Sequence, residues 1–350
     1  MPDPGFRYPA EWERHEATWL GWPHNRSDWP GKFEPIPWVF AEMTRHIALG
    51  EIVRIIVQSP DHEKLVRSIL GRAGVDPKCV EYFRCRTDRG WTRDFGPMFV
   101  KRRRPRRGVA ILNYKFNAWA KYPDWHKDNA VPPKVGRKFG HRVIRVMHGD
   151  RQVVLEGGAI DVNGRGTLIT TEECLLQQEV QVRNPGLSRE DMNEVFRKYF
   201  GATNVLWLNR GIAGDDTHGH VDDLCRFVNR NTVVLCCEKN KRDANHALLE
   251  ENFALIRHMR LGDGSRINVV PLPMPAPLSF EGQRLPASYA NFYICNACVL
   301  VPTFNDPNDR VALGILGDLF KDRPVIGIHA VDLVWGLGTI HCLTREQPAL

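Results

Sequence analysis

The chain alternates between short apolar runs and longer stretches in which apolar residues recur with helical spacing. The short runs are predicted as strands from their length and, in most of them, from their β-branched residues. They lie at 51–59, 96–100, 109–116, 204–208, 232–238, 267–274, 324–331 and 339–344. Residues 289–304 contain two such runs and predict a β-hairpin.

Helices are predicted at 61–74, 188–201, 243–262 and 306–320. Each has a start signal in its first residues. Asp61, Asp243 and Asp306 are expected as N-caps, and Ser188 with Asp191 forms a capping-box pattern. The resulting order of strand, helix and strand, often with an extra hairpin, indicates a mixed α/β fold. No low-complexity linker divides the chain, so we expect one domain over residues 1–350.

Composition narrows the class of protein. The 350 residues are 43% hydrophobic and 25% charged, as in ordinary globular proteins. No apolar run reaches 18 residues, and the first residues lack the basic-then-apolar order of a signal peptide. Nine cysteines, an odd number scattered along the chain, favour free thiols in a reducing compartment. We therefore expect a cytoplasmic protein with no membrane partner.

The net charge of +7 raises the question of nucleic-acid binding. Much of the excess lies in the sequence KRRRPRRG at 101–108, between two predicted strands. A solvated hairpin loop is the favoured interpretation, because no aromatic residues are interleaved with the basic ones. A nucleic-acid-binding patch at Arg102 to Arg107 stays as an alternative, but no nucleic-acid partner is expected.

Carboxylates interrupt two of the apolar runs. Asp94 lies just before a predicted strand, beside Trp91 and Arg93, and could simply form a turn with that arginine. Glu156 follows an apolar run and precedes Gly157 and Gly158. A buried carboxylate is costly unless it is paired, and adjacent glycines allow close approach of a ligand or of another backbone segment. An exposed glutamate in a glycine-rich bulge is the alternative.

Residues 215–223 are the most unusual stretch, because they hold four acids and two histidines within nine positions. In an extended segment, His218, His220 and Asp222 would point to one face. Two histidines and a carboxylate are also metal-ligand chemistry. A metal site is therefore the main alternative to a metal-free site, although no second ligand group of matching spacing occurs.

Cys342 follows Gly336 and Gly338 near the end of the chain. A lone cysteine with a distant histidine and acids is a candidate nucleophile. The remaining cysteines are expected to be inert packing residues. They are Cys79, Cys85, Cys174, Cys225, Cys236, Cys237, Cys295 and Cys298.

Four motifs occur in an order that resembles the agmatine deiminase and bacterial peptidylarginine deiminase-like family. They are WTRDFGP, LEGGAI with GTLITTEECLL, GDDTHGHVDD, and GTIHCLT followed by QP. The segments PAEWERHEATWLGWP and SYANFYI match as well, so the resemblance covers nearly the whole chain. It implies the pentein fold, a five-bladed α/β propeller of ββαβ units, and guanidine chemistry without metal or cofactor.

The same resemblance implies a role for each candidate residue. Cys342 would be the nucleophile and His220 the general acid and base. Asp94 and Asp222 would bind the guanidinium, Glu156 would position the histidine, and Trp91 would line the site. The chemistry of the side chains agrees, because carboxylates bind the N–H edges of a cationic guanidinium through charge-assisted hydrogen bonds.

The expected activity is hydrolytic deimination of a small cationic guanidino substrate, through a covalent thiouronium on Cys342. Agmatine, which would give N-carbamoylputrescine and ammonia in polyamine metabolism, is the leading substrate. Arginine, peptidyl-arginine and other guanidines stay open, because Thr339, His218 and residues 87–90 depart from the common family pattern. We expect these positions to contact the far end of the substrate. A metallohydrolase using His218, His220 and Asp222 is the alternative from another class of enzyme. The sequence makes no prediction of the oligomeric state.

Overall fold

Five times within the described residues, an antiparallel pair of strands is combined with a helix and with a strand parallel to the second strand of the pair. The computed structural model describes residues 5–102 and 108–350, and we number these units as modules. Module 1 consists of β21 (Thr344–Pro348), β2 (His15–Gly21), α1 (Ile36–Ile47), β3 (Ile52–Val57), α2 (Pro60–Arg72) and β4 (Val80–Arg84). Module 2 consists of β5 (Met98–Arg102), β6 (Gly108–Asn113), α5 (Val131–Phe139) and β7 (Arg142–Arg145). Module 3 consists of β10 (Asp161–Val162), β11 (Thr167–Thr171), α7 (Arg189–Phe200) and β12 (Asn204–Leu208).

Module 4 consists of β13 (Cys225–Phe227), β14 (Thr232–Cys237), α8 (Ala244–His258) and β15 (Asn268–Pro273). Module 5 consists of β18 (Tyr293–Ile294), β19 (Val299–Thr303), α9 (Asn308–Leu319) and β20 (Val325–His329). The remaining strands are β1 (Phe6–Arg7), β8 (Met147–His148), β9 (Arg151–Gln152), β16 (Ser279–Phe280) and β17 (Gln283–Arg284). Short helices are α3 (Thr92–Phe95), α4 (His126–Asn129), α6 (Glu172–Leu175) and α10 (Ile340–Leu343). The 3₁₀ turns are η1 (Arg26–Asp28), η2 (Pro77–Cys79), η3 (Ala118–Ala120), η4 (Gly157–Ala159), η5 (Val221–Asp223) and η6 (Leu333–Gly336).

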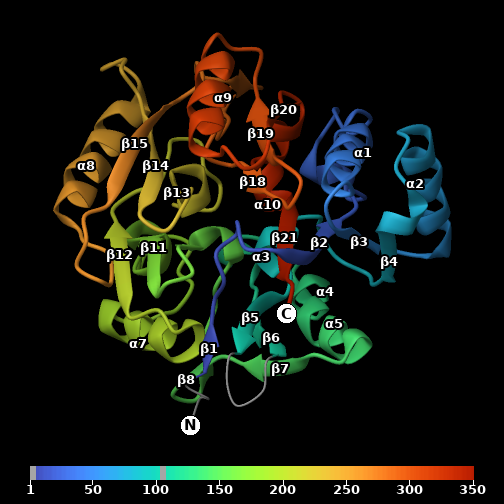
Figure 1. The fold of residues 1–350 in the computed structure, drawn as a ribbon, viewed down its shortest axis with the longest axis horizontal. Helices are drawn as coiled ribbons and strands as arrows, with labels where there is room; N and C mark the ends of the chain where they lie inside the picture. Colours follow the sequence, from blue (N-terminus) through green and yellow to red (C-terminus); the bar gives the residue numbers. More distant parts are fainter. Residues whose placement is uncertain (1–4, 103–107) are drawn as a thin grey trace.

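The modules follow one another around a common centre, and the two ends of the chain close the ring. Figure 1 shows the module helices α1, α5, α7, α8 and α9 in this order around the molecule, with α3 and α10 nearer the centre. The last strand, β21, pairs antiparallel with β2, so that Leu20 faces Thr344 in the first sheet. This topology agrees with the five-bladed α/β propeller that the sequence predicted.

The strand predicted at 51–59 is confirmed as β3, which is largely buried. In module 1, β3 lies between β2 and β4 in the sheet and contacts both α1 and α2. Its residues Ile55, Ile56 and Val57 have no exposed surface. A strand covered on its faces by helices gains from being apolar at every position, which explains the continuous run in the sequence.

Two helix starts agree with the predictions. α7 has the expected capping box, in which Ser188 and Asp191 bond each other's backbone N–H groups, and it ends at Gly201 in a left-handed conformation. α8 begins after Asp243, whose side chain accepts from the N–H of Asn245. In both, a side-chain oxygen satisfies an N–H group that has no partner inside the helix.

Two other helix starts differ from the predictions by one or two residues. α2 is capped by Ser59, whose hydroxyl accepts from the N–H of His62, so Asp61 lies inside the first turn. In α9, Pro307 occupies the N-cap position predicted for Asp306. Asp306 still accepts from the N–H of Asn308 at 2.8 Å.

One strand prediction is wrong. Residues 339–344 contain the helical turn α10, and the closing strand β21 begins only at Thr344. Thr339 and Gly338 end a turn that lets the chain reverse before it enters the sheet. Cys342 therefore lies on a short helix rather than on a strand. Of the basic loop predicted at 101–108, residues 103–107 fall outside the described residues, while Lys101 and Arg102 end β5 and Gly108 begins β6.

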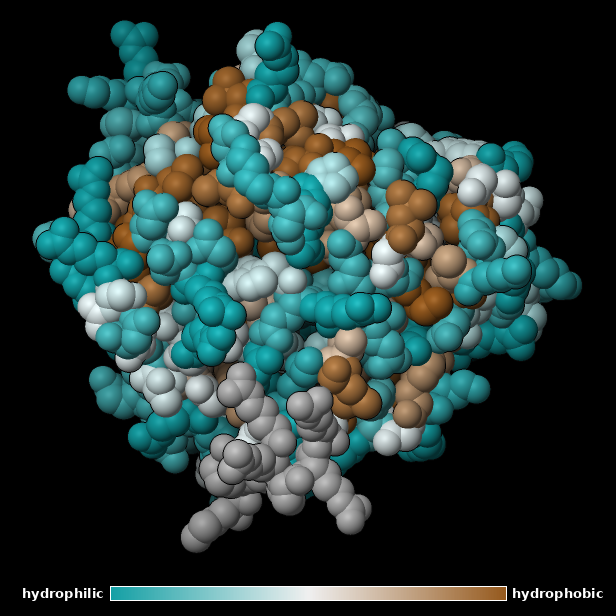
Figure 2. Space-filling view, viewed as in Figure 1, coloured by the Kyte–Doolittle hydropathy of each residue, from teal (hydrophilic) through white to brown (hydrophobic). Residues whose placement is uncertain are grey.

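The face seen in Figure 2 is mainly hydrophilic, and hydrophobic side chains show mostly in its upper half. Among the described residues, no helix combines the length and apolar character needed to cross a bilayer. All nine cysteines are described and free, as expected. Cys295 and Cys298 lie close together, with 3.4 Å between their Sγ atoms.

Candidate active site

The four sequence motifs converge on short turns at the centre of the ring. Asp94 lies on α3, Glu156 directly precedes η4, His220 directly precedes η5, and Cys342 lies on α10. α3 contacts both α10 and η4, and η4 contacts η5. We call Asp94, Glu156, His220 and Asp222 the acid centre; all four are buried. The structure thus brings together the five residues predicted for catalysis and guanidinium binding.

The Cys342 thiol faces the acid centre and an asparagine. Its Sγ lies 3.8 Å from Oδ2 of Asp222 and accepts a hydrogen bond from Nδ2 of Asn291 at 3.1 Å. Burial, together with the carboxylates of Asp222, Asp223 and Asp94, raises the pKa of this thiol well above its usual value. A cation bound among these acids would reverse that effect and favour the thiolate.

Asn291 was not predicted as a site residue, although its segment SYANFYI was noted. Its Oδ1 accepts from the hydroxyl of Thr339 at 2.7 Å and from the N–H of His341 at 3.0 Å. Its amide donates to Asp223 at 2.9 Å as well as to the thiol. Thr339 therefore orients the amide that bonds to the Cys342 thiol, and it is not among the residues that line the pocket described below.

His220 is surrounded by three carboxylates without a close bond to any of them. Its Nδ1 lies 3.9 Å from Asp94 and 3.9 Å from Asp222, and its Nε2 lies 3.8 Å from Glu156. Burial alone would lower the pKa of His220, but Asp94, Cys174 and Glu156 outweigh burial and raise it well above its usual value. The imidazole is therefore protonated near neutral pH and can act as an acid.

Hydrogen bonds hold both Asp94 and Asp222 in place, and Asp222 keeps one oxygen without a partner among the described residues. Asp94 accepts from the N–H of Gly158 at 2.9 Å and from the indole N–H of Trp119 at 2.8 Å. Asp222 accepts from Nδ1 of His341 at 2.6 Å, and its Oδ1 has no hydrogen-bond partner among the described residues. Burial and the neighbouring acids raise the pKa of Asp94, whereas the bond from His341 overcomes burial and lowers the pKa of Asp222.

Gly158 explains the glycine pair that follows Glu156. A Cβ atom at this position would lie 2.6 Å from Nδ1 of His220 and 3.0 Å from Oδ1 of Asp94. Such contacts are too short for any side chain, so only glycine lets the backbone approach the acid centre. The expectation of a close approach at this pair is confirmed.

Glu156 differs from the other acids because it has an arginine partner. Nε of Arg183 donates to its Oε1 at 3.1 Å, and Arg183 is itself held by the carbonyl groups of Gln181 and Thr217. Burial opposes ionisation, but Arg183 and His220 lower the pKa of Glu156 to about 2. Arg183 was missed in the sequence because it lies 27 residues from its partner, in a loop without a motif.

Behind the acid centre lies a second buried group of charges, which we call the paired layer. It consists of Glu11, Arg93, Arg226 and Glu346. His341 joins the two groups, since its Nε2 lies 2.8 Å from Glu11 and its Nδ1 bonds Asp222. The alternative of a simple turn bond between Arg93 and Asp94 is wrong, because Arg93 pairs with Glu11 and Glu346.

A pocket leads from the surface to the thiol. It is lined by Ser27, Asp28, Arg89, Trp91, Asp94, Trp119, Tyr122, Asp216, Thr217, Gly336, Leu337 and Cys342. Trp91 forms a wall, as predicted, and its ring lies 5.3 Å from that of Trp29. A Cβ atom on Gly338 would lie 2.9 Å from Trp91 and 3.2 Å from the Cys342 sulfur, which explains the glycines before the cysteine.

Arg89, from the departing sequence at 87–90, lines this pocket. Its guanidinium bonds Asp28 at 2.5 Å and Asp124 at 3.1 Å. Despite this partner, burial raises the pKa of Asp28 to about 7. The wall of the pocket therefore carries a cation that is already compensated by carboxylates.

His218 does not join the site. The segment 215–223 is not extended, because turns precede His220 and the 3₁₀ turn η5 follows it. His218 adopts a left-handed backbone conformation with φ of 62°, and its Nδ1 lies 3.7 Å from Glu173. Asparagine tolerates this conformation better than most residues, which accounts for asparagine as the usual family residue here. The predicted common face for His218, His220 and Asp222 is therefore wrong.

Two groups of side chains within the described ranges have a spacing that could hold a metal ion. They are Glu156 with Cys174 and His220, and Asp222 with Asp223 and Cys342. His218 belongs to neither. A protonated His220 is a poor ligand, and burial with Asp222 and Asp215 raises the pKa of Asp223 well above its usual value. The donor set suits a bound organic cation better than a metal.

Comparisons with known proteins agree with this geometry. A sequence model of the Porphyromonas-type peptidyl-arginine deiminase family matches residues 7–348. Agmatine deiminase of Stutzerimonas stutzeri is 33% identical, with 99% of this chain and 96% of that protein covered. Agmatine deiminase of Medicago truncatula is 34% identical, with coverage of 99% and 97%. A solved agmatine deiminase from Enterococcus faecalis superposes with a TM-score of 0.88 at 29% identity, covering 98% of this chain and 96% of that one.

Proposed function

The chain belongs to the Porphyromonas-type peptidyl-arginine deiminase family, and from this premise we propose that it is an agmatine deiminase. In this proposal it hydrolyses a carbon–nitrogen bond of agmatine and releases N-carbamoylputrescine and ammonia. One observation carries the proposal: three buried carboxylates surround a histidine, two of them keep an oxygen without a partner among the described residues, and one of these two, Asp222, lies 3.8 Å from a buried thiol. Such a site requires a planar cation that donates several hydrogen bonds, and a guanidinium is that cation.

Binding comes first and prepares the nucleophile. The guanidinium donates to Asp94 and Asp222, and its positive charge offsets the acids that keep Cys342 protonated. The pKa of the thiol then falls, its proton passes to solvent, and the thiolate forms only when substrate is present. The amide of Asn291, which donates to the sulfur at 3.1 Å, stabilises the thiolate and orients it.

The first chemical step forms a carbon–sulfur bond and breaks a carbon–nitrogen bond. The Cys342 thiolate attacks the central guanidino carbon, and the protonated His220 gives its proton to the departing nitrogen. Ammonia leaves, and an S-alkylthiouronium stays on Cys342. His220 is now neutral, and Glu156 continues to hold the ring beside the reacting carbon.

The second step returns the enzyme to its starting state. Neutral His220 takes a proton from a water molecule, whose oxygen attacks the thiouronium carbon. The carbon–sulfur bond breaks, the adduct's hydroxyl proton passes to the departing thiolate as the carbonyl of the ureido product forms, and Cys342 is again a thiol beside a protonated His220. General acid and base catalysis of this kind contributes ~10² to 10⁴-fold to a rate.

The wall around Arg89 bears on the choice of substrate. Arg89 is paired with Asp28 and Asp124, and Asp216 lies on the same pocket. Around Arg89 the carboxylates outnumber the cations. This part of the pocket therefore favours a substrate whose far end is cationic, as in agmatine. Arginine brings a carboxylate to this wall and is therefore the poorer substrate in this proposal.

The setting of the reaction is also a proposal. The whole chain would act as one catalytic domain, since the site draws on segments from Glu11 to Glu346. Nine free thiols favour the cytoplasm, where they stay reduced. The expected partner is the small guanidino substrate, without cofactor, nucleic acid or membrane.

Ammonia release across a panel of guanidino compounds tests the proposal. Agmatine should give the highest kcat/KM, ahead of arginine, a peptide with C-terminal arginine, and other small guanidines. The Cys342→Ala variant serves as the control for contaminating activity. Release from arginine alone would reject agmatine as substrate, and release from none of the compounds would reject deimination.

A further inference from the structure

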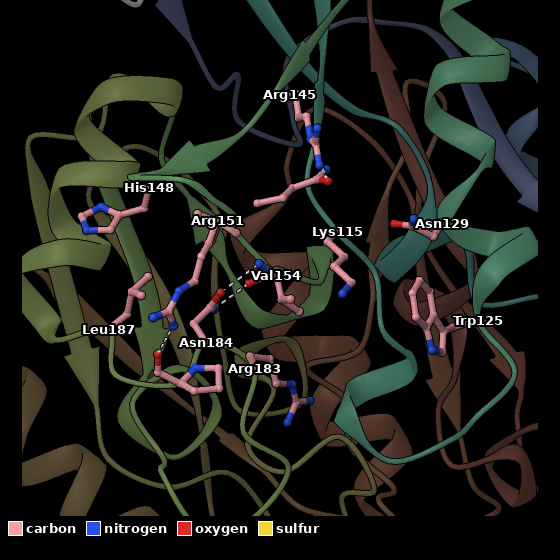
Figure 3. A pocket seen from close by; sticks show the side chains of 13 residues that line it. Lys115, Trp125, Asn129, Arg145, His148, Arg151, Val154, Arg183, Asn184 and Leu187 are labelled. Carbon is pink, nitrogen blue, oxygen red and sulfur yellow. Dashed lines mark hydrogen bonds between the residues drawn. The ribbon is translucent and has the colours of Figure 1, made fainter.

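A second cavity, outside the candidate active site, is lined by basic side chains. It encloses about 460 Å³ and lies where the chain passes from module 2 to module 3 (Figure 3). Its basic residues are Lys115, Arg145, His148, Arg151 and Arg183. Aspartate and glutamate are absent from the described residues that line it. A cavity of this size is in the range that holds a small ligand.

Three of these cations lack a carboxylate partner in the part of the chain that the structure describes. Lys115 places its ammonium 5.1 Å from the ring centre of Trp125. Arg145 donates to the side-chain carbonyl of Gln152 at 3.0 Å, and Arg151 donates to the carbonyl of Pro185 at 3.0 Å. These neutral partners orient the ammonium and guanidinium groups but do not neutralise their positive charges. Like charges gathered around one cavity repel each other unless an anion enters.

At the floor of the cavity, polar groups already have hydrogen-bond partners within the protein. Asn184 exchanges two hydrogen bonds with the backbone of Val154, at 2.9 and 2.8 Å (Figure 3). Arg183 lies beneath, and its charge is already used by Glu156. His148 lies 3.3 Å from Asp191 at the rim. The uncompensated charge is therefore confined to Lys115, Arg145 and Arg151, which come from three different segments around the opening.

We propose that this cavity binds a small polyanion that carries more than one phosphate group. A single monoanion could not pair with three cations from separate segments at once. Arginine side chains present parallel N–H groups that match phosphate oxygens, and lysine adds a point charge. The two arginines are exposed at the opening, where a ligand can reach them, while Lys115 is half-buried inside.

The cavity does not suit nucleic acid. Trp125 is the only Trp, Tyr or Phe side chain among the described lining residues, and His126 stacks on its ring at 3.9 Å. Non-specific binding of single strands relies on free aromatic faces together with a charged groove. Here His126 covers one face of the ring, so a free aromatic face of the kind that single strands stack on is reduced.

Isothermal titration calorimetry of the full chain with inorganic pyrophosphate tests this site. The wild type should bind pyrophosphate more tightly than orthophosphate. A double variant, Lys115→Gln with Arg151→Gln, should bind pyrophosphate roughly tenfold or more weakly, because two charged donors are lost. Its deimination rate should stay unchanged, since neither residue touches the acid centre.

The matched control removes the same charges elsewhere. Lys239→Gln with Arg242→Gln lies in the exposed turn between β14 and α8 and should leave pyrophosphate affinity as in the wild type. Equal weakening in both double variants would show unspecific attraction to a basic protein and would overturn the proposal. Absence of pyrophosphate binding to the wild type would overturn it as well. Tight binding of an RNA oligonucleotide that pyrophosphate does not displace would assign the surface to nucleic acid instead.

Discussion

Two buried groups of charged side chains, the acid centre and the paired layer, are neighbours in this protein. They differ in how their carboxylates are hydrogen-bonded. In the paired layer, Glu11 accepts from Arg93 and Arg226, each at 3.0 Å, and Arg93 also bonds Glu346 at 2.7 Å. In the acid centre, both ring nitrogens of His220 and one oxygen each of Asp222 and Glu156 have no partner among the described residues. The same residue types therefore serve two purposes within one core.

The difference shows how a ligand site can be separated from a structural one. A buried charge that is fully paired stabilises the fold only while its partners stay in place. A buried polar atom without a partner costs free energy until a ligand supplies the missing bond. The unpartnered atoms of the acid centre therefore lower the stability of the free protein and are available to a ligand. The paired layer instead holds the acid centre in position through His341. Substitutions on the two sides should separate stability from activity.

The largest effect is expected at the thiol. Cys342→Ala removes the proposed nucleophile and should abolish measurable ammonia release, while calorimetry still detects agmatine binding. Cys342→Ser should be nearly as inactive, because a hydroxyl ionises far less readily than a thiol. Steady-state assays with both variants measure this. Near wild-type activity in Cys342→Ala would mean that the thiol is not the nucleophile.

The next largest effect is expected in the paired layer, on stability. Glu11→Gln removes the charge that compensates Arg93 and Arg226, both of which are buried. Breaking a buried ion pair on one side typically lowers the free energy of unfolding by ~3–5 kcal/mol. Denaturant unfolding monitored by circular dichroism measures the loss. A change below about 1 kcal/mol would contradict the structural role of this layer.

Asp94→Asn is the matched variant on the other side and should lower activity without lowering stability. Its carboxylate has like-charged neighbours that raise its pKa, so neutralising it relieves repulsion. The free energy of unfolding should stay level or rise. The value of kcat/KM for agmatine should fall by roughly ten- to hundredfold, because a charge-assisted bond of ~1.5–3 kcal/mol is lost.

Asp222→Asn should lower kcat/KM for agmatine in the same way, but it should also lower the free energy of unfolding, by less than Glu11→Gln does, because it weakens the bond from His341 that lowers the pKa of Asp222. An amide presents N–H donors to a guanidinium that has only donors, so one contact becomes repulsive. If both amide variants kept wild-type kcat/KM, the proposed grip on the guanidinium would be wrong. A loss of stability equal to that of Glu11→Gln would remove the distinction between the two groups.

Glu156→Gln should have a smaller effect, mainly on kcat. Glu156 helps to raise the pKa of His220, so its neutral replacement lowers that pKa. His220 must be protonated to release ammonia, so the basic limb of kcat against pH should move to lower pH. The expected loss in kcat is about tenfold near neutral pH. An unchanged pH profile with raised KM would assign Glu156 to substrate binding instead.

Local structure and the central residues were predictable from the sequence. Apolar runs identified strands such as β3, and the capping box at Ser188 identified the start of α7, because these signals act over a few residues. Cys342 and His220 were found because motif order pointed to them. The helical turn at α10 was missed, since a short apolar run does not distinguish a strand from a single turn of helix.

Residues that act across the ring were not predictable. Arg183, Asn291 and Glu11 contribute through partners that lie 27, 51 and 330 residues away along the chain. No periodicity or local spacing carries that information. His218 shows the opposite error. The density of ligand-type residues suggested that it shares a face with His220 and Asp222, but its own left-handed backbone conformation turns its side chain away from them.

The smallest effect, none at all, is expected on removing metal. The two groups that could hold an ion include His220 and Asp223, and the pKa values of both are raised well above their usual values, which favours their protonated forms. A metal must displace those protons before it binds, whereas a guanidinium uses the ionised acids as they are. Dialysis against a strong chelator should therefore leave ammonia release unchanged. Loss of activity that added zinc or manganese restores would replace the guanidinium grip with a metal site, and the acid centre would then be a ligand set.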